Sequence, residues 1–150
     1  MGAARHLSLL PDVAAELITW PVPFADGIPR LIALRGKRVV ALASGDPFWY
    51  GAGSVLVRHL EPHEWRSIAG PATFSLAAAQ MGWPLEDTVC VGLHAAPLSR
   101  LRPHLANGFR AIVLLRDGAA VAELSTYLSQ EGFGESTLTV MEALGGPRQR

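Results

Sequence analysis

The sequence predicts an α/β domain with a largely parallel sheet. Short β-branched apolar runs alternate along the chain with segments whose apolar residues recur at helical spacing. Glycine- and proline-containing turns separate the two kinds of segment. Apolar residues make up 49% of the 150 residues and charged residues 17%, so the chain can bury a core and is not disordered.

The first half of the chain contains two predicted strands and two predicted helices. Residues 37–44 (KRVVALAS) form an apolar run typical of a parallel strand that is covered on both faces. Apolar residues repeat at helical spacing from 52 to 60. Residues 64–70 (EWRSIAG) predict a second, weaker strand. Residues 71–82 (PATFSLAAAQMG) predict a helix that begins at a proline and ends at a glycine.

The second half repeats the same alternation. Strands are predicted at residues 88–93 (TVCVGL), 110–116 (RAIVLLR) and 136–144 (STLTVMEAL). A short helix is predicted at residues 97–105 and a longer amphipathic helix at residues 119–132. Each of the first two strands is followed by a helix, which favours parallel pairing through crossover connections.

Turn-forming residues concentrate in one segment, 82–88 (GWPLEDT), which we interpret as the boundary between two lobes. We therefore expect α/β lobes at residues 1–83 and 84–150. Residues 67–85 carry no charge, but their glycines, prolines and small side chains make them too weakly hydrophobic for a membrane span. We expect no membrane partner.

Charge and cysteine content exclude several classes of protein. Lys+Arg and Asp+Glu both number 13, so no net field favours nucleic acid or an anionic membrane surface. Cys90 is the only cysteine, which excludes an intramolecular disulfide framework. The first residues do not have the pattern of a secretory signal. These features predict a cytoplasmic protein without a nucleic-acid partner.

A candidate ligand site follows the strand predicted at residues 37–44, in the stretch ALASGDPFWYGAG (41–53). In parallel sheets, ligands bind beyond the carboxyl ends of strands. Gly45 would allow close approach of backbone, and Asp46 can accept hydrogen bonds from amides or ligand hydroxyls. The aromatic residues 48–50 would offer flat apolar walls. The alternative is a turn and helix cap whose aromatic residues belong to the core.

Other catalytic templates do not fit. The chain has neither a P-loop pattern nor the G-x-G-x-x-G of dinucleotide-binding folds. His59 and His63 have the spacing of metal ligands on a helix, but Pro62 interrupts that turn and no third ligand is evident. No serine has a nucleophile-elbow context, and Cys90 lies in an apolar strand. We expect no metal and no covalent nucleophile.

Several blocks together resemble the tetrapyrrole (corrin/porphyrin) methylase family, in its order and spacing and over nearly the whole chain. The blocks are LASGDPFWYGAG, AGPATFSLAAAQMGWPLED, VGLHAAPLSRLRPHL, AIVLLRDGAA and LTVMEALGGPRQR. The resemblance implies two α/β lobes with S-adenosyl-L-methionine in the cleft between them. It also implies C-methylation of a corrin precursor of cobalamin biosynthesis, and the blocks are most similar to the branch that acts on precorrin-6Y.

The resemblance assigns roles to individual positions. His94 becomes a candidate on the substrate side, and no catalytic residue or general base is assigned. Transfer to an electron-rich carbon requires mainly alignment and exclusion of water. The positions that match cofactor-binding residues are Gly45, Asp46, Trp49, Thr73, Phe74, Leu115, Arg116 and Glu142.

Each assigned position also has a purely structural interpretation. Thr73 can cap a helix, Phe74 and Leu115 can be core residues, and Arg116 can pair with a neighbouring acid. His94 can be an ordinary loop histidine. From residue types alone these alternatives stay open.

The chain also departs from the family pattern. The glycine-rich G-I-G-x-x-G loop of the first strand is absent, and the sequence stops before the last strands of the second lobe. GLHAA stands where relatives carry SLHGR, without the arginine that could meet a substrate carboxylate. We therefore expect a domain incomplete at both ends, and a homodimer, because an incomplete sheet leaves backbone groups unpaired.

These departures leave alternatives to an active precorrin-6Y methylase. One is a non-catalytic fragment of such an enzyme. Others are sister methylases of the same fold, namely another precorrin methylase, a diphthine synthase or a ribosomal RNA ribose methylase. We also expect a decarboxylating methyltransferase domain as a further domain or separate partner.

Overall fold

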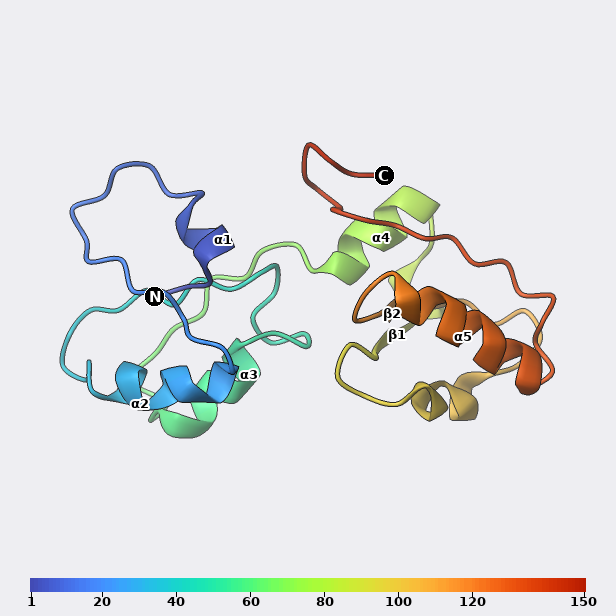
Figure 1. Cartoon of the computed structure of the whole chain (residues 1–150), viewed down its shortest axis with the longest axis horizontal. Helices are drawn as coiled ribbons and strands as arrows, with labels where there is room; N and C mark the ends of the chain where they lie inside the picture. The colour runs from blue at the N-terminus through green and yellow to red at the C-terminus, as the bar shows by residue number, and fades with distance from the viewer. The chain divides into compact units, whose positions relative to one another are not determined.

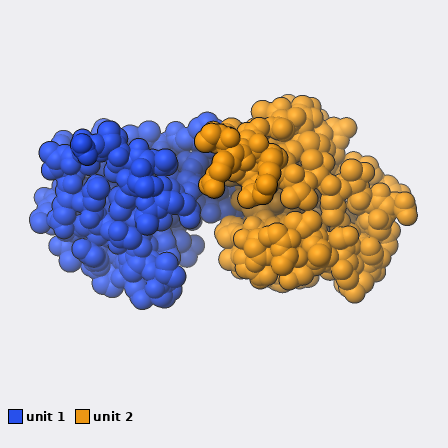
Figure 2. Space-filling view, turned by 45° about the horizontal axis from the view of Figure 1, so that its top comes forward, with its two compact units in different colours: residues 1–72 blue, residues 73–150 orange.

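The computed structural model describes residues 1–150 as two compact units, Met1–Ala72 (unit 1) and Thr73–Arg150 (unit 2), which Figure 2 shows in different colours. The predicted α/β class is confirmed, with a small parallel sheet in unit 2. No helix in either unit has the length and apolar character needed to cross a bilayer.

Unit 1 consists of short helices joined by long irregular segments. Its elements are α1 (Ala4–Leu7), η1 (Phe24–Asp26), α2 (Gly27–Ile32), α3 (Gly53–Leu56) and η2 (Val57–His59). Its core contains the buried side chains of Met1, Ile18 and Leu31. The helix predicted over 52–60 is present as α3 and the 3-10 turn η2.

Three extended segments of unit 1 lie side by side without forming a regular sheet. The Met1 amino group donates to Val40 O at 2.7 Å, and Leu42 N donates to Met1 O at 2.8 Å. On the other side, Gly2 forms an isolated parallel bridge with Thr19. Because α1 begins at Ala4, directly after these contacts, the pairing consists of the bonds at Met1 and Gly2 and forms no regular ladder.

The two strands predicted in unit 1 are therefore wrong as regular elements. Residues 37–44 are extended and paired at Val40 and Leu42 only. Residues 64–70 form no strand, and Ile68 is 82% exposed. Strand formation needs a neighbouring backbone along its length, which these segments do not have.

An ion pair joins the turn after α2 to the loop after η2. Arg35 binds both carboxylate oxygens of Glu64, with Nη2 to Oε2 at 2.8 Å, and Glu64 Oε2 also accepts from the Glu61 amide at 2.8 Å. The hydrogen bond from Arg35, followed by that from Glu61, lowers the pKa of Glu64 from its ordinary 4.5 to about 2.

This shift predicts an acid-sensitive contribution to stability. The folded-state pKa lies below the unfolded one, so the contribution is complete above pH 4.5 and is lost as the pH falls towards 2. We expect the Tm of the wild type to fall as the pH is lowered from 4.5 to about 2, and the Tm of Glu64→Gln to fall less over the same pH range. The effect is modest because the pair is partly solvated. Glu16→Gln, at an exposed carboxylate, is the control; equal slopes in both variants would contradict the prediction.

Unit 2 contains the sheet and the longer helices. Its elements are α4 (Thr73–Met81), η3 (Leu85–Asp87), β1 (Val89–Gly92), η4 (Leu98–His104), β2 (Ala111–Leu114) and α5 (Ala119–Gln130). Strands β1 and β2 pair in parallel, with Val89 opposite Ala111 and Gly92 opposite Leu114. The predicted strands at 88–93 and 110–116 and the predicted helices at 71–82 and 119–132 are confirmed.

Apolar side chains cover both faces of this small sheet. Ile112 of β2 packs with Phe74, Ala77 and Ala78 of α4. The other face belongs to a cluster formed by β1, η4 and α5, and Figure 1 places α5 alongside the two strands. The members of that cluster that are buried are Val91, Leu93, Leu101, Leu124 and Leu128.

Two features of unit 2 differ from expectation. The compact units divide after Ala72, whereas the sequence suggested lobes ending at 83; the contact of α4 with β2 explains why α4 belongs to unit 2. The strand predicted over 136–144 is wrong. This segment pairs with neither strand, and Val140 is 63% exposed.

Candidate functional site

The candidate site in unit 1 is the loop 44–53, which follows the extended segment at Val40 and Leu42. Gly45 has a φ of +58°, a conformation that side-chain-bearing residues rarely adopt. The loop then turns back on itself before α3. The sequence correctly predicts a sharp turn here, and the glycines explain how the backbone makes it.

Gly51 and Gly53 are required by close backbone approaches within this loop. A Cβ at Gly51 would lie 2.6 Å from the carbonyl oxygens of both Asp46 and Pro47. A Cβ at Gly53 would lie 2.7 Å from Pro47 O. These distances are below van der Waals contact and involve backbone atoms, so a side chain at either position forces the loop to move.

Asp46 shapes the first turn of the loop. Its Oδ1 accepts a hydrogen bond from the Phe48 amide at 2.8 Å, an Asx turn. A carboxylate has acceptor capacity beyond one hydrogen bond, so Asp46 can also accept one from a ligand hydroxyl. Asp46 is half-buried, and Ser54 Oγ donates to Gly51 O at 2.8 Å at the other end of the loop.

The aromatic residues of the loop are on the surface. Phe48, Trp49 and Tyr50 are 43%, 38% and 45% exposed, so the alternative that places them in the core is wrong. Phe48 stacks at a tilt on Trp65, with ring centroids 5.4 Å apart. Tyr50 has a φ of +55°, a strained conformation for an aromatic residue, and such strain clusters at functional loops.

A second predicted segment lies directly against this loop. The Gly70 amide donates to Gly45 O at 3.3 Å, and a Cβ at Gly45 would lie 3.0 Å from Pro71 O. Two backbone segments that the sequence separates by about a sixth of the chain are thus in contact. The structure brings together the SGDP turn and the AGPA segment that precedes Thr73.

Two basic side chains at this loop were not predicted. His6 Nε2 lies 2.9 Å from Ser44 Oγ, and Arg5 Nη2 donates to the same oxygen at 3.4 Å. Ser44 is the first residue of the loop. No local sequence signal places α1 beside it; the only hint is an adjacent arginine and histidine in the stretch ARHL.

In unit 2, three predicted residues follow the carboxyl ends of the two parallel strands. Leu93 N donates to Leu114 O at 2.8 Å, which keeps the ends of β1 and β2 together. His94 is exposed immediately after that contact, and Leu115 and Arg116 follow β2. This edge is where ligands bind in parallel sheets.

The two charged residues predicted in unit 2 have acidic or basic partners. Arg116 pairs with Asp117 at 2.8 Å, and this hydrogen bond lowers the pKa of the Asp117 carboxyl. Asp117 also accepts from the Ala120 amide at the start of α5. Glu142 pairs with Arg150 at 2.7 Å. Both side chains are exposed, so these pairs do not prevent ligand contact.

The apolar residues predicted in unit 2 differ in exposure. Phe74 is 1% exposed and belongs to the core around Ile112, so any ligand contact would use its backbone. Leu115 packs against the cluster on the other sheet face. Thr73 is exposed at the first residue of α4, where its hydroxyl is accessible.

The other reactive residue types give no further site. Burial raises the pKa of the Cys90 thiol, which makes it a weaker nucleophile at neutral pH. Histidine, cysteine, aspartate and glutamate form no group of three or more that could hold a metal ion.

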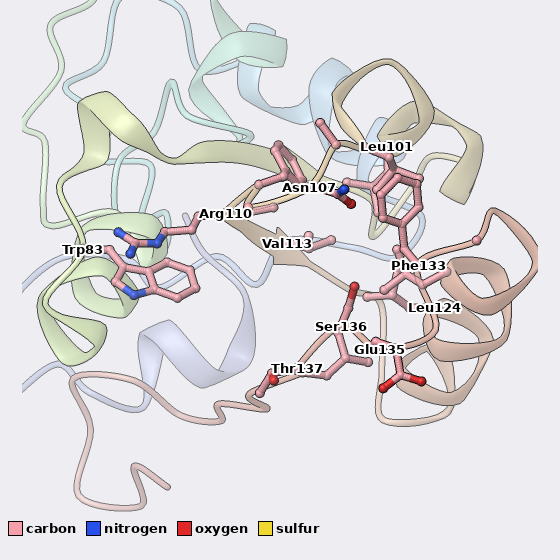
Figure 3. Close-up of a pocket in the computed structure, with 18 residues that line it drawn as sticks. Trp83, Leu101, Asn107, Arg110, Val113, Leu124, Phe133, Glu135, Ser136 and Thr137 are labelled. Atoms are coloured by element: carbon pink, nitrogen blue, oxygen red, sulfur yellow. The ribbon is translucent and has the colours of Figure 1, made fainter.

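A groove of about 600 Å³ in unit 2 lies beside β2, between η4, α5 and the extended residues 136–138 (Figure 3). Arg110 lies over the Trp83 ring at one end, 5.6 Å from its centroid. The walls are largely apolar, with Leu101, Val113 and Phe133 among them. None of the residues predicted from the sequence lines this groove.

Comparison with known proteins gives one family and several relatives. The family model described as Tetrapyrrole (Corrin/Porphyrin) Methylases matches residues 30–150. A Sinorhizobium sp protein named precorrin-6Y C(5,15)-methyltransferase (decarboxylating) is 44% identical over 150 residues, covering 99% of this chain and 36% of the relative. A Mycobacterium tuberculosis protein of the same name is 37% identical, covering 99% of this chain and 37% of the relative.

A further relative is shorter. The Salmonella typhimurium protein named cobalt-precorrin-7 C(5)-methyltransferase is 28% identical over 149 residues, covering 99% of this chain and 73% of the relative. The chain thus spans little more than a third of the length of the precorrin-6Y relatives. No solved structure gives a significant match.

Proposed function

The chain belongs to the tetrapyrrole (corrin/porphyrin) methylase family, and on this premise we propose that it is the S-adenosylmethionine-binding methylase region of an enzyme that acts on precorrin-6Y in cobalamin biosynthesis. The observation that carries the proposal is the loop 44–53. Its aromatic residues are exposed, its glycines allow close backbone approach within the turn, and the turn lies against Gly70 and Pro71.

The relatives' names favour one ring carbon. Two relatives are named for C(5,15) methylation and decarboxylation, and the shorter one is named for C(5) methylation alone. This chain aligns over 99% of its length with each of them. We infer that the shared region methylates C5, and that C15 methylation and decarboxylation belong to parts of the longer relatives outside this alignment.

The residues of the loop fit the proposed cofactor. Asp46 is a half-buried carboxylate with acceptor capacity beyond its bond to the Phe48 amide, which suits a ribose hydroxyl, and the exposed residues Gly45 and Trp49 suit a polar ligand. The exposed aromatic rings offer surface to an adenine. When bound, S-adenosylmethionine supplies an electrophilic methyl group. In unit 2, Thr73, Phe74, Leu115, Arg116 and Glu142 remain predicted cofactor contacts.

The protein's own contribution is alignment and exclusion of water. A precorrin carbon that is already electron-rich needs no base to accept a methyl group, so we assign no general base. His94, exposed beyond β1, is the proposed contact on the substrate side.

We further propose a cytoplasmic homodimer. The two-stranded sheet leaves the outer edges of β1 and β2 unpaired, and exposed strand edges favour association with a second copy. A single cysteine fits a reducing compartment. Elution of the purified chain as a compact monomer in size-exclusion chromatography with light scattering would contradict the dimer.

The test of cofactor binding is isothermal titration of S-adenosylhomocysteine into the purified chain. We expect saturable binding that is lost in Asp46→Arg and weakened about tenfold in Asp46→Asn, because the amide cannot replace a charged acceptor. Asp12→Asn, an exposed carboxylate elsewhere in unit 1, is the matched control and should bind normally. A folded chain that does not bind would instead be a non-catalytic member of the family.

A further inference from the structure

Three polar side chains converge at the first residue of the loop 44–53. Ser44 Oγ lies 2.9 Å from His6 Nε2 and accepts a long hydrogen bond of 3.4 Å from Arg5 Nη2. Arg5 and His6 come from α1, 38 or 39 residues earlier in the chain. The cluster therefore places a guanidinium and an imidazole directly beside Gly45.

The Arg5 guanidinium has no acidic partner. Arg35, Arg116 and Arg150 each pair with a carboxylate, whereas Arg5 forms no ion pair and uses one of its five donors on a neutral hydroxyl. Its remaining donors can form the paired hydrogen bonds that a carboxylate accepts.

His6 lies close to Gly2 and Leu42. Gly2 lies so close to this part of α1 that a Cβ there would be 3.0 Å from Leu42 Cβ and 3.5 Å from His6 Cβ. The Nδ1 atom of His6 is buried and has no hydrogen-bond partner. The hydrogen bond of the imidazole ring is therefore the one between Nε2 and Ser44. An unsatisfied buried nitrogen costs stability, and in native structures such atoms are uncommon.

We propose that Arg5, His6 and Ser44 form a carboxylate-binding site at the start of the loop. The inference rests on the proposed function, since it supplies a polar anchor for a ligand of the same loop. Two ligands of the proposed reaction carry the required group: corrin precursors have acetate and propionate side chains, and S-adenosylmethionine has an α-carboxylate. The Arg5 guanidinium supplies the positive charge, and the hydrogen bonds of Ser44 with Arg5 and His6 orient that guanidinium.

The experiment compares ligands with and without the carboxylate. S-adenosylhomocysteine is paired with 5′-methylthioadenosine, which lacks the amino-acid end. Cobyrinic acid, a corrin with free carboxylates, is paired with cobinamide, in which they are amides. Each is titrated into the wild type, Arg5→Gln and Arg30→Gln. Arg30 is the matched control, an exposed arginine of α2 in the same unit.

We expect Arg5→Gln to weaken binding of one carboxylate-bearing ligand about tenfold and to leave its carboxylate-free partner unchanged. Loss confined to S-adenosylhomocysteine assigns the site to the cofactor, and loss confined to cobyrinic acid assigns it to the substrate. Ser44→Ala should produce a smaller loss on the same ligand. Circular dichroism of each variant checks that it folds.

Two results would overturn the proposal, and they differ. If Arg5→Gln and Arg30→Gln bind every ligand alike while Asp46→Arg still loses S-adenosylhomocysteine, the carboxylate site is wrong and the proposed function stands. If the folded wild type binds none of the ligands, the proposed function fails and the site fails with it.

Discussion

Replacing Gly51 with alanine should weaken S-adenosylhomocysteine binding at least about tenfold and lower the free energy of unfolding by about 1–3 kcal/mol. The new Cβ would lie 2.6 Å from the carbonyl oxygens of Asp46 and Pro47. Neither oxygen is at the end of a flexible side chain, so the backbone of the loop must shift. Because Asp46 is the proposed ribose contact, binding and stability should fall together. Titration calorimetry and urea denaturation measure the two effects.

Gly118→Ala is the matched control for this experiment. A Cβ at Gly118 meets nothing within 4 Å, and its φ of −64° is accessible to alanine. Alanine there should leave stability unchanged or raise it slightly, because it restricts the unfolded chain. If Gly51→Ala unfolded like the wild type and bound the ligand normally, the loop would not be the tight turn on which the site depends.

Elements whose signals are local could be predicted from the sequence. The helix α5 has an amphipathic repeat, and β1 and β2 are short apolar runs joined by a crossover, so neighbours along the chain determine them. The segments 37–44 and 136–144 have equally apolar sequences but no continuous backbone partner. Whether a run becomes a strand depends on that partner, which lies far away in the sequence.

The residues of the candidate site also divide into those that local sequence predicts and those that depend on distant contacts. Gly45 and Asp46 could be identified because a turn needs particular residue types at adjacent positions. Arg5 and His6 could not, because their contact with Ser44 joins residues 38 or 39 positions apart and depends on how the start of the chain packs beside Leu42. The exposure of the aromatic residues could not be predicted from the sequence either. Phe48 is 43% exposed and Phe74 is 1% exposed, although both are phenylalanine.

That difference predicts a second large effect, at Phe74. Its side chain is 1% exposed and fills the space between α4 and Ile112, so Phe74→Ala should lower the free energy of unfolding by about 3–5 kcal/mol. Phe48→Ala removes the same atoms at a position that is 43% exposed, where the loss should stay below about 1 kcal/mol. Urea denaturation followed by circular dichroism measures both.

A third variant, Phe74→Leu, tests what Phe74 does in the site. Phe74→Leu keeps most of the buried volume, so a contact made by the backbone of α4 should survive it, and S-adenosylhomocysteine should bind within about threefold of the wild type. If the ligand needed the aromatic ring, Phe74→Leu would weaken its binding strongly while changing the free energy of unfolding only slightly. Equal destabilisation by Phe74→Ala and Phe48→Ala would instead mean that the core around Ile112 does not depend on this ring.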